Sequence, residues 1–435
     1  MMKIPDSPPL LSLANSLRSG ELSLHEYLAQ LELQFLQWES EVKAFLPEEG
    51  RFERLRRQAL GLMERYPHPI NRPPLFGLPV GIKDIFNVDG FETRAGSKIP
   101  PEELGGREAQ SVTRLKEAGA LIAGKSVTTE FAYFAPGPTH NPNNFDHTPG
   151  GSSSGSAAAV SAGLCPVALG TQTIGSIIRP AAFCGVAGYK PSYDRISKYG
   201  VIPLSPSLDH IGVLATDIAG IELLASQLCP DWQIVVRETK PVLGIPEGPY
   251  MRHATTEGIT SFRNTCKRLE ENGCEIRSVS VMADFDEISD RHQIILAAEA
   301  AQVHSQWYSV YRDRYHPKTA ALIERGREIA VGRLAEAMTG RRQLRKSLTD
   351  VMDDCGIDLW ISPSATGPAP QGLANTGDPI MNLPWTHSGL PAVNLPAGKN
   401  EEGLPMGLQV VGRWYEDEAV LEWCAQLEFM IQSEP

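Results

Sequence analysis

Two short segments of the chain place serine hydroxyls among glycines, an arrangement that suits nucleophilic chemistry. The first segment, GGSSSGS, covers residues 150–156, and the second, GTQTIGSIIRPAAFCG, covers residues 170–185. In the second, Gly175 and Ser176 can form a tight turn that directs a hydroxyl and nearby backbone N–H groups toward one point. The first segment, taken alone, is equally typical of a flexible turn or an anion-binding loop.

Hydrolysis of an amide requires a nucleophile, a proton shuttle and donors for the developing oxyanion. Histidine is the usual shuttle, but the ten histidines occupy no triad-like setting, and the sequence has no G-x-S-x-G motif. Lys83 lies within FGLPVGIKDIF (76–86), which we expect to form a short buried strand. Burial would lower the pKa of the amine from about 10.4. A surface lysine in a salt bridge is the ordinary alternative for an isolated lysine. Asp84 should point to the opposite face of that strand.

Five segments of the chain, taken together and in order, resemble the amidase signature family. They are GLPVGIKDIF (77–86), GKSVTTEFA (124–132), PGGSSSGSAAAVSAG (149–163), GTQTIGSIIRPAAFCGVAGYKPS (170–192) and GLPMGLQVVG (403–412). The resemblance implies a Ser–Ser–Lys triad. In it Ser176 is the nucleophile, Ser152 is the bridging serine that follows a cis peptide bond, and Lys83 is the remote base.

The resemblance also implies that the oxyanion is bound by backbone N–H groups, those of Thr173, Ile174, Gly175 and Ser176. This sequence departs from the commoner family pattern at two positions. Gln172 stands where an aspartate is usual, and Ile174 stands where a small residue is usual. Because isoleucine is β-branched, Ile174 can restrict the backbone and narrow the pocket.

Arg179 follows the nucleophile by three positions, where many family members have an arginine two positions after it. The offset is similar to that of malonamidase-like members, in which this arginine holds a substrate carboxylate through its planar fork. We expect Arg179, Gln172 and Ser153 to bind substrate. A structural arginine, paired with a buried acid or with backbone carbonyls, is an equally weighted alternative for Arg179.

The function that the resemblance implies is hydrolysis of a carboxylic amide to an acid and ammonia or an amine, through a Ser176 acyl-enzyme. The substrate would be a small-molecule amide that carries a carboxylate. One alternative is the A subunit of a tRNA-dependent amidotransferase, which releases ammonia from glutamine. Another is a non-catalytic paralogue that binds or scaffolds. Chain length, acidic balance and the shifted arginine favour a stand-alone amidase.

The segments that carry these motifs alternate between expected strands and helices, which is typical of an α/β protein. Ser23 and Glu26 form a capping box that should begin a helix. Further helices are expected at 111–120 and 256–272, with strands at 120–126, 240–248, 358–364 and 407–413, and a Pro/Gly-rich loop at 382–398. We expect one amidase-signature domain over 1–435, with a central mixed β-sheet covered by helices on both faces. Its signature core would lie at about 70–220, and a mainly helical excursion at about 255–355.

The composition narrows the range of partners and cofactors. The net charge of −12 argues against nucleic-acid binding. Seven scattered cysteines without a C-x-x-C pair or a Cys/His cluster indicate reduced thiols in a cytoplasmic protein and no metal site. Cys184 is expected in the core, not as a nucleophile.

The longest apolar stretch, 156–169, is too short to span a membrane, and the N-terminus lacks the apolar region of a signal peptide. The mechanism requires no cofactor, and a homodimer is left open.

Overall fold

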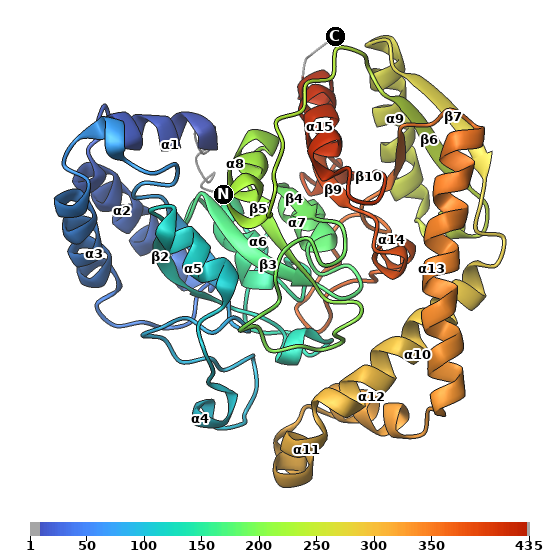
Figure 1. The fold of residues 1–435 in the computed structure, drawn as a ribbon, viewed down its shortest axis with the longest axis horizontal. Helices are drawn as coiled ribbons and strands as arrows, with labels where there is room; N and C mark the ends of the chain where they lie inside the picture. The colour runs from blue at the N-terminus through green and yellow to red at the C-terminus, as the bar shows by residue number, and fades with distance from the viewer. Residues whose placement is uncertain (1–8, 433–435) are drawn as a thin grey trace.

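Ten strands form a single mixed sheet at the centre of the molecule, seen in Figure 1 in a computed structural model that describes residues 9–432. The strand order is β2-β1-β3-β5-β4-β9-β10-β8-β6-β7. β1 runs parallel to β2 and β3, whereas β5 is antiparallel to β3 and β4. The strands are β1 (Pro79–Lys83), β2 (Leu121–Ser126), β3 (Val167–Gln172), β4 (Ala187–Lys190), β5 (His210–Ala215), β6 (Val242–Glu247), β7 (Glu275–Ser280), β8 (Leu359–Pro363), β9 (Ala392–Lys399) and β10 (Pro405–Val411).

Helices cover both faces of this sheet, and neighbouring residues of β4 show the two sides. A side chain at Gly188 would meet Ala181, whereas Tyr189 donates a hydrogen bond to Asp417 at 2.7 Å. Ala181 belongs to α7 and Asp417 begins α15, so these helices lie on opposite faces. The helices are α1 (Leu10–Ser19), α2 (Leu24–Val42), α3 (Arg51–Arg65), α4 (Pro101–Leu104), α5 (Gln110–Glu117), α6 (Ser154–Ser161), α7 (Ile178–Cys184), α8 (Ile218–Leu228), α9 (Thr256–Glu271), α10 (Phe285–Val303), α11 (Ser305–Tyr311), α12 (Pro317–Arg327), α13 (Val331–Asp354), α14 (Leu383–Ser388) and α15 (Asp417–Gln432). The expected α/β class is confirmed.

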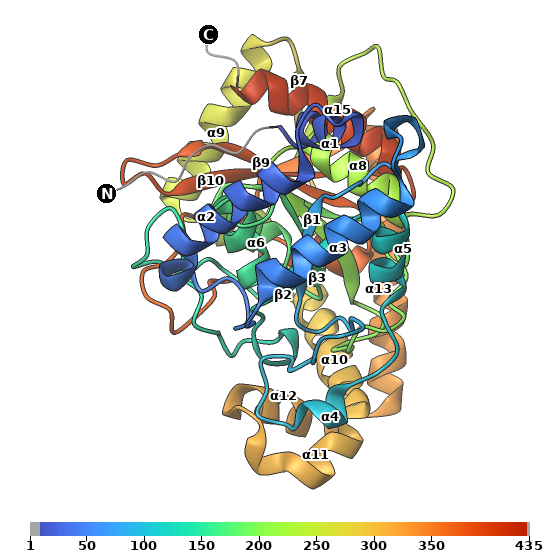
Figure 2. The ribbon, with the colours of Figure 1, turned by 90° about the vertical axis from the view of Figure 1, so that its left-hand side faces the viewer.

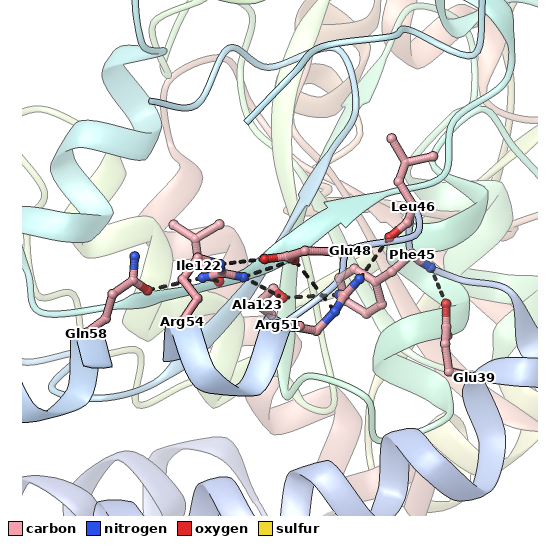
Figure 3. A network of polar contacts seen from close by, with 9 residues as sticks. All are labelled: Glu39, Phe45, Leu46, Glu48, Arg51, Arg54, Gln58, Ile122 and Ala123. Carbon is pink, nitrogen blue, oxygen red and sulfur yellow. Dashed lines mark hydrogen bonds and ion pairs between the residues drawn. The ribbon is translucent and has the colours of Figure 1, made fainter. Parts of the chain in front are cut away.

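The N-terminal helices α2 and α3 run side by side and cover the edge strand β2 (Figure 2). As expected, Ser23 begins α2, and its hydroxyl accepts a hydrogen bond from the backbone N–H of Glu26. Arginines of α3 reach the carbonyl groups of β2: Arg54 donates to Ile122 at 2.8 Å and Arg51 to Ala123 at 3.2 Å (Figure 3). These contacts protect an edge that would otherwise expose unpaired backbone groups.

The segment that we expect to be mainly helical, 255–355, contains α9 to α13 and also the edge strand β7. α10 packs against both α12 and α13, and the group projects from one end of the sheet (Figure 1). Glu130, just after β2, ties it to the signature core. Its carboxylate accepts hydrogen bonds from the backbone N–H of His316 at 3.0 Å and from the hydroxyl of Thr319 at 2.5 Å.

The prediction of a loop over 382–398 was wrong. That segment contains the short helix α14 and the inner strand β9. Pro384 is tolerated because it occupies the first turn of α14, where its missing N–H is not needed, and Gly389 ends the helix with a left-handed φ of 77°. The prolines and glycines of this segment mark the ends of a helix and a strand. They do not form one long loop.

All seven cysteines are free thiols, as expected from the sequence. No helix within residues 9–432 combines the length and apolar character needed to cross a membrane. The single domain expected over 1–435 extends past the described residues at both ends, and it stays a prediction.

Candidate active site

The three residues of the expected triad converge from three different elements of the signature core. Lys83 is the last residue of β1, Ser152 lies in the loop that leads into α6, and Ser176 lies between β3 and α7. The Nζ atom of Lys83 is 2.7 Å from the Oγ atom of Ser152. Ser152 and Ser176 both border one small cavity. The base, the bridging serine and the nucleophile therefore meet at one site.

Lys83 is fully buried, and within the described part of the chain its amine contacts only uncharged groups. Besides Ser152, its Nζ atom lies 2.7 Å from the hydroxyl of Thr171 and 3.4 Å from the carbonyl oxygen of the same residue. No carboxylate in residues 9–432 forms an ion pair with it. Burial lowers the pKa of Lys83 well below its ordinary value, and the charge of Asp209 opposes this effect in part. A neutral amine can accept a proton from Ser152.

The loop that carries Ser152 is held against the strands around it. The Gly151–Ser152 peptide bond is cis, as the resemblance implies. The carbonyl of Ser152 accepts a hydrogen bond from the N–H of Thr129 at 3.3 Å, and the N–H of Ser153 donates to the carbonyl of Ser176 at 3.3 Å. The second contact joins the two serine loops directly. The hydroxyl of Ser176 has no hydrogen-bond partner in the described part of the chain, so it is free to attack a substrate.

The cavity beside Ser176 is small and largely covered. Its volume of about 10 Å³ holds about one water molecule. Tyr133, Phe134 and Pro379 help to line it, together with Ile174 and Arg179. This cavity alone does not hold an amide substrate.

The loop at 173–176 is arranged as an oxyanion-binding loop would be. No acceptor among the described residues pairs with the backbone N–H groups of Ile174, Gly175 and Ser176. Ile174 is absent from the residues with a positive φ, so its β-branched side chain causes no backbone strain there. A side chain at Gly175 would approach the Oδ1 atom of Asn382 to 2.3 Å, so the loop requires glycine at this position.

Gln172 supports the 173–176 loop through hydrogen bonds and does not line the cavity. Its Oε1 atom accepts hydrogen bonds from the N–H groups of Ile177 at 2.8 Å and Ile178 at 3.0 Å. Its amide group donates to the hydroxyl of Thr386 at 2.9 Å, and that hydroxyl donates to the carbonyl of Ile174 at 2.6 Å. An aspartate could accept the first two bonds but could not donate the third. Substrate binding by Gln172 stays an untested prediction.

Ser153 also lies outside the cavity lining. It is fully buried, and its hydroxyl contacts the backbone of Thr171 on β3, donating to the carbonyl at 3.2 Å and accepting from the N–H at 3.3 Å. Its expected contact with substrate has not been tested either. In the structure, Ser153 fixes the serine loop to the strand that ends at the oxyanion loop.

Asp209 was not predicted from the sequence, and it supports the oxyanion loop from another side. Its carboxylate accepts hydrogen bonds from the hydroxyl of Thr173 at 2.6 Å and from the N–H groups of Leu204 at 2.8 Å and Ser205 at 3.0 Å. Burial raises the pKa of Asp209 to about 6, although these bonds act in the opposite direction. The loop 203–209 is thereby linked to Thr173. The sequence SPSLDH contains no signal that would single out this aspartate.

Arg179 lines the cavity, but most of its donors are already engaged. Its two terminal nitrogens donate to the carbonyl groups of Gly377 at 2.6 Å and Gly151 at 2.7 Å, and one also contacts the hydroxyl of Thr376 at 3.1 Å. Its Nε atom has no partner within the described residues. Burial lowers the pKa of Arg179 to about 9, which leaves it charged at neutral pH. Both expected roles, structural support and carboxylate binding, fit these contacts.

Neither the thiol of Cys184 nor a larger cavity beside α2 is the centre of the chemistry. Cys184 is buried, its thiol contacts the carbonyl of Pro149, and burial raises the pKa of the thiol far above neutrality, so it behaves as a core residue. A larger cavity of about 760 Å³ lies between α2 and the loops at 94–97 and 135–138, and Glu39, Phe45 and Arg51, which Figure 3 labels, help to line it. None of Lys83, Ser152 and Ser176 lines it.

Comparisons with known proteins identify the family to which the chain belongs. A family model described as Amidase matches residues 49–421. The A subunit of the glutamyl-tRNA(Gln) amidotransferase of Synechococcus sp. (strain CC9311) is 31% identical over 468 residues, which cover 95% of this chain and 95% of that protein. A crystal structure of an amidase has a TM-score of 0.87 and 30% identity, covering 98% of this chain and 99% of its own. The peptide amidase of Stenotrophomonas maltophilia shares the fold, with a TM-score of 0.82, 20% identity and coverage of 99% and 98%. The chain belongs to the amidase family, whose members are amidase-signature hydrolases.

Proposed function

We propose that this protein hydrolyses a small carboxylic amide through an acyl-enzyme on Ser176. The observation that carries the proposal is the position of Lys83. It is a buried lysine without an ion-pair partner among the described residues, and its amine is 2.7 Å from Ser152. A lysine with no other evident task, whose neutral form is favoured by burial, suits a base that acts through a bridging hydroxyl.

The reaction then proceeds in two steps, acylation and deacylation of Ser176. The Oγ atom of Ser176 attacks the amide carbon, its proton passes to Ser152, and the proton of Ser152 passes to Lys83. The oxyanion receives hydrogen bonds from the free N–H groups of the 174–176 loop. As the carbon–nitrogen bond breaks, the relay returns the proton to the leaving nitrogen. Water attacks the ester by the same relay and releases the acid, which regenerates Ser176.

The finer specificity that we propose is for an amide that also bears a carboxylate, as in malonamidase-like members. Arg179 supports it, because this buried guanidinium lines the cavity beside Ser176 and forms no ion pair in residues 9–432. A carboxylate at this point would compensate a charge that, among the described residues, contacts only carbonyl and hydroxyl groups. The Nε atom has no hydrogen-bond partner within those residues.

A second candidate function is the A subunit of a tRNA-dependent amidotransferase. It is favoured by the similarity to proteins of that name, at 31% identity over 95% of the chain. The shifted arginine and the acidic net charge of −12 favour the stand-alone amidase instead. In the amidotransferase role the same triad would release ammonia from glutamine for a partner.

Purified chain, without partners, tests the proposal directly. We expect ammonia release from one or more members of a panel of small amides, with and without a free carboxylate. A fluorophosphonate should label Ser176, located by mass spectrometry, and Ser176→Ala should lose at least about 10³-fold in kcat. Labelling at Ser152 or Ser154 would contradict the assignment. Hydrolysis of glutamine only after a partner is added would support the amidotransferase role, and no hydrolysis at all would indicate a non-catalytic protein.

A further inference from the structure

A second cavity, of about 190 Å³, adjoins the cavity of Ser176. The two share a boundary, because Ala132 and Leu204 line both of them. The second cavity also touches Thr171, whose hydroxyl is 2.7 Å from the amine of Lys83. It therefore lies beside the catalytic machinery and offers the space that the 10 Å³ cavity lacks.

The walls of the second cavity are mostly aliphatic. The lining comes from the segment just after β1, from the loop 198–206 and from β5, and it includes Ile85, Val201, Ile202, Leu204 and Ile211. Such a surface favours an apolar occupant, because an unpaired polar group would lose its hydrogen bonds to water on entry.

The polar groups at the edge of this cavity already have partners. The amine of Lys198 donates to the hydroxyl of Tyr193 at 2.9 Å and to the carbonyl of Pro206 at 3.0 Å. Both carboxylate oxygens of Asp209 accept hydrogen bonds from within the chain. The cavity thus presents no evident site for a charged group of a ligand.

The volume sets the size of the group that fits. An engineered cavity of about 150 Å³ lined by similar side chains binds benzene. At about 190 Å³, this cavity has room for one aromatic ring or a branched aliphatic group of similar size, but not for a long chain.

We propose that the cavity lined by Val201, Ile202 and Leu204 is a substrate subsite that accepts a compact apolar group, an aryl or branched alkyl substituent of the amide. The inference rests on the proposed function, because it makes this group part of the molecule hydrolysed at Ser176. The substituent belongs either to the acyl part or to the amine part, and both have the same chemistry at this subsite.

The subsite is also connected to the oxyanion loop. The N–H of Leu204 donates to Asp209, and Asp209 accepts from the hydroxyl of Thr173. A group that packs on Leu204 acts on the segment that supports Thr173. We therefore expect the apolar group to raise kcat and not only to lower KM.

Two matched substrate pairs test the subsite. Benzamide against acetamide reports on the acyl side, and acetanilide against N-methylacetamide reports on the amine side. In at least one pair, the aryl member should have a kcat/KM at least about tenfold higher, which is the low end for filling an apolar pocket. Val201→Phe, at a half-buried loop position, should remove most of this ratio, whereas Val201→Ala should improve 2-naphthamide relative to benzamide. Val236→Phe, at a site that is 75% exposed and lines neither cavity, is the matched control and should leave the ratio unchanged.

A binding measurement separates this inference from the proposed function. The ¹⁹F NMR signal of 4-fluorobenzamide and of 4′-fluoroacetanilide should broaden with wild type and with Val236→Phe, and should do so much less with Val201→Phe. If wild type binds a probe in this way but hydrolyses no amide, the proposed function fails and the subsite stands. Hydrolysis without an aryl preference, or a preference that Val201→Phe leaves intact, overturns the subsite. Absence of both hydrolysis and binding overturns both.

Discussion

Replacement of Thr171 by valine would test whether Lys83 works as a neutral base. Valine keeps the shape of threonine but removes the hydroxyl, which lies 2.7 Å from the amine of Lys83. Among residues 9–432, only the Oγ atom of Ser152 lies equally close, and the carbonyl of Thr171 is farther away at 3.4 Å. The variant therefore removes one of two short contacts of the base and leaves the relay to Ser152 in place.

The size of the effect follows from the protonation state that the hydroxyl stabilises. A hydrogen bond to a charged group contributes roughly 1.5–3 kcal/mol and one between neutral groups roughly 0.5–1.5 kcal/mol. Loss of the hydroxyl thus disfavours the ammonium form by about 1–1.5 kcal/mol more than the neutral amine, which corresponds to about one pH unit. Since the neutral amine is the active form, the acidic limb of the pH profile should move to lower pH. The maximal rate should also fall, by roughly 5–30-fold, because Lys83 is positioned less well.

The assay is the pH dependence of kcat/KM for wild type, Thr171→Val and Thr171→Ser. Rate should rise with pH in all three, through an ionisation below the ordinary value for lysine, because burial lowers the pKa of Lys83. The Thr171→Ser variant retains a hydroxyl, so the acidic limb of its pH profile should lie at the wild-type pH. An acidic limb that stays in place or moves to higher pH in Thr171→Val would refute the reasoning, even if the variant were slower.

Three further predictions concern buried titratable side chains. Lys83→Arg should fold but be nearly inactive, because a guanidinium cannot give up its proton to act as a base; wild-type turnover would exclude the relay. Arg179→Ala should lose about 10²-fold or more in kcat/KM on a carboxylate-bearing amide and much less on a neutral amide of equal size, with Arg179→Lys recovering only part; equal losses would make Arg179 structural. Burial lowers the pKa values of His292 and His304 to about 3, so the unfolded chain binds protons first as pH falls below about 6.5, and stability should decrease between about pH 6.5 and 3. Urea unfolding at pH 7 and pH 5 measures this decrease, and a midpoint that did not fall would contradict it.

The expected triad could be named from the sequence because each member lies in a short motif that resembles one of the amidase signature family. Gly175 before Ser176 is visible in the sequence, although the reason for it, a close approach to Asn382, lies far along the chain. Lys83 ends a continuous buried strand, and because neighbouring residues set that pattern, it can be read from the sequence. Helices with caps and regular apolar spacing, such as α2 after Ser23, were predictable for the same reason.

Contacts between distant segments left no such pattern. Thr386 supports the carbonyl of Ile174 across 212 positions, and Asp209 reaches Thr173 across 36. The segment of Thr386 reads as a loop from its prolines and glycines, yet it forms α14 because burial against α10 and α13 outweighs weak local propensity. Residue type alone could not reveal these partners.

The departures from the commoner family pattern are explained by the same long-range contacts. Gln172 retains an acceptor for the amides of Ile177 and Ile178, and its added donor binds Thr386, which in turn holds Ile174. The two unusual residues, Gln172 and Ile174, are thus joined through one hydroxyl. A charged aspartate would leave the Thr386 hydroxyl to donate to two acceptors at once, although it has a single proton. The substitutions therefore form a coupled set that keeps the backbone donors of the oxyanion loop in place. Restoring aspartate at position 172 alone should disturb the loop more than a comparison with other family members would suggest.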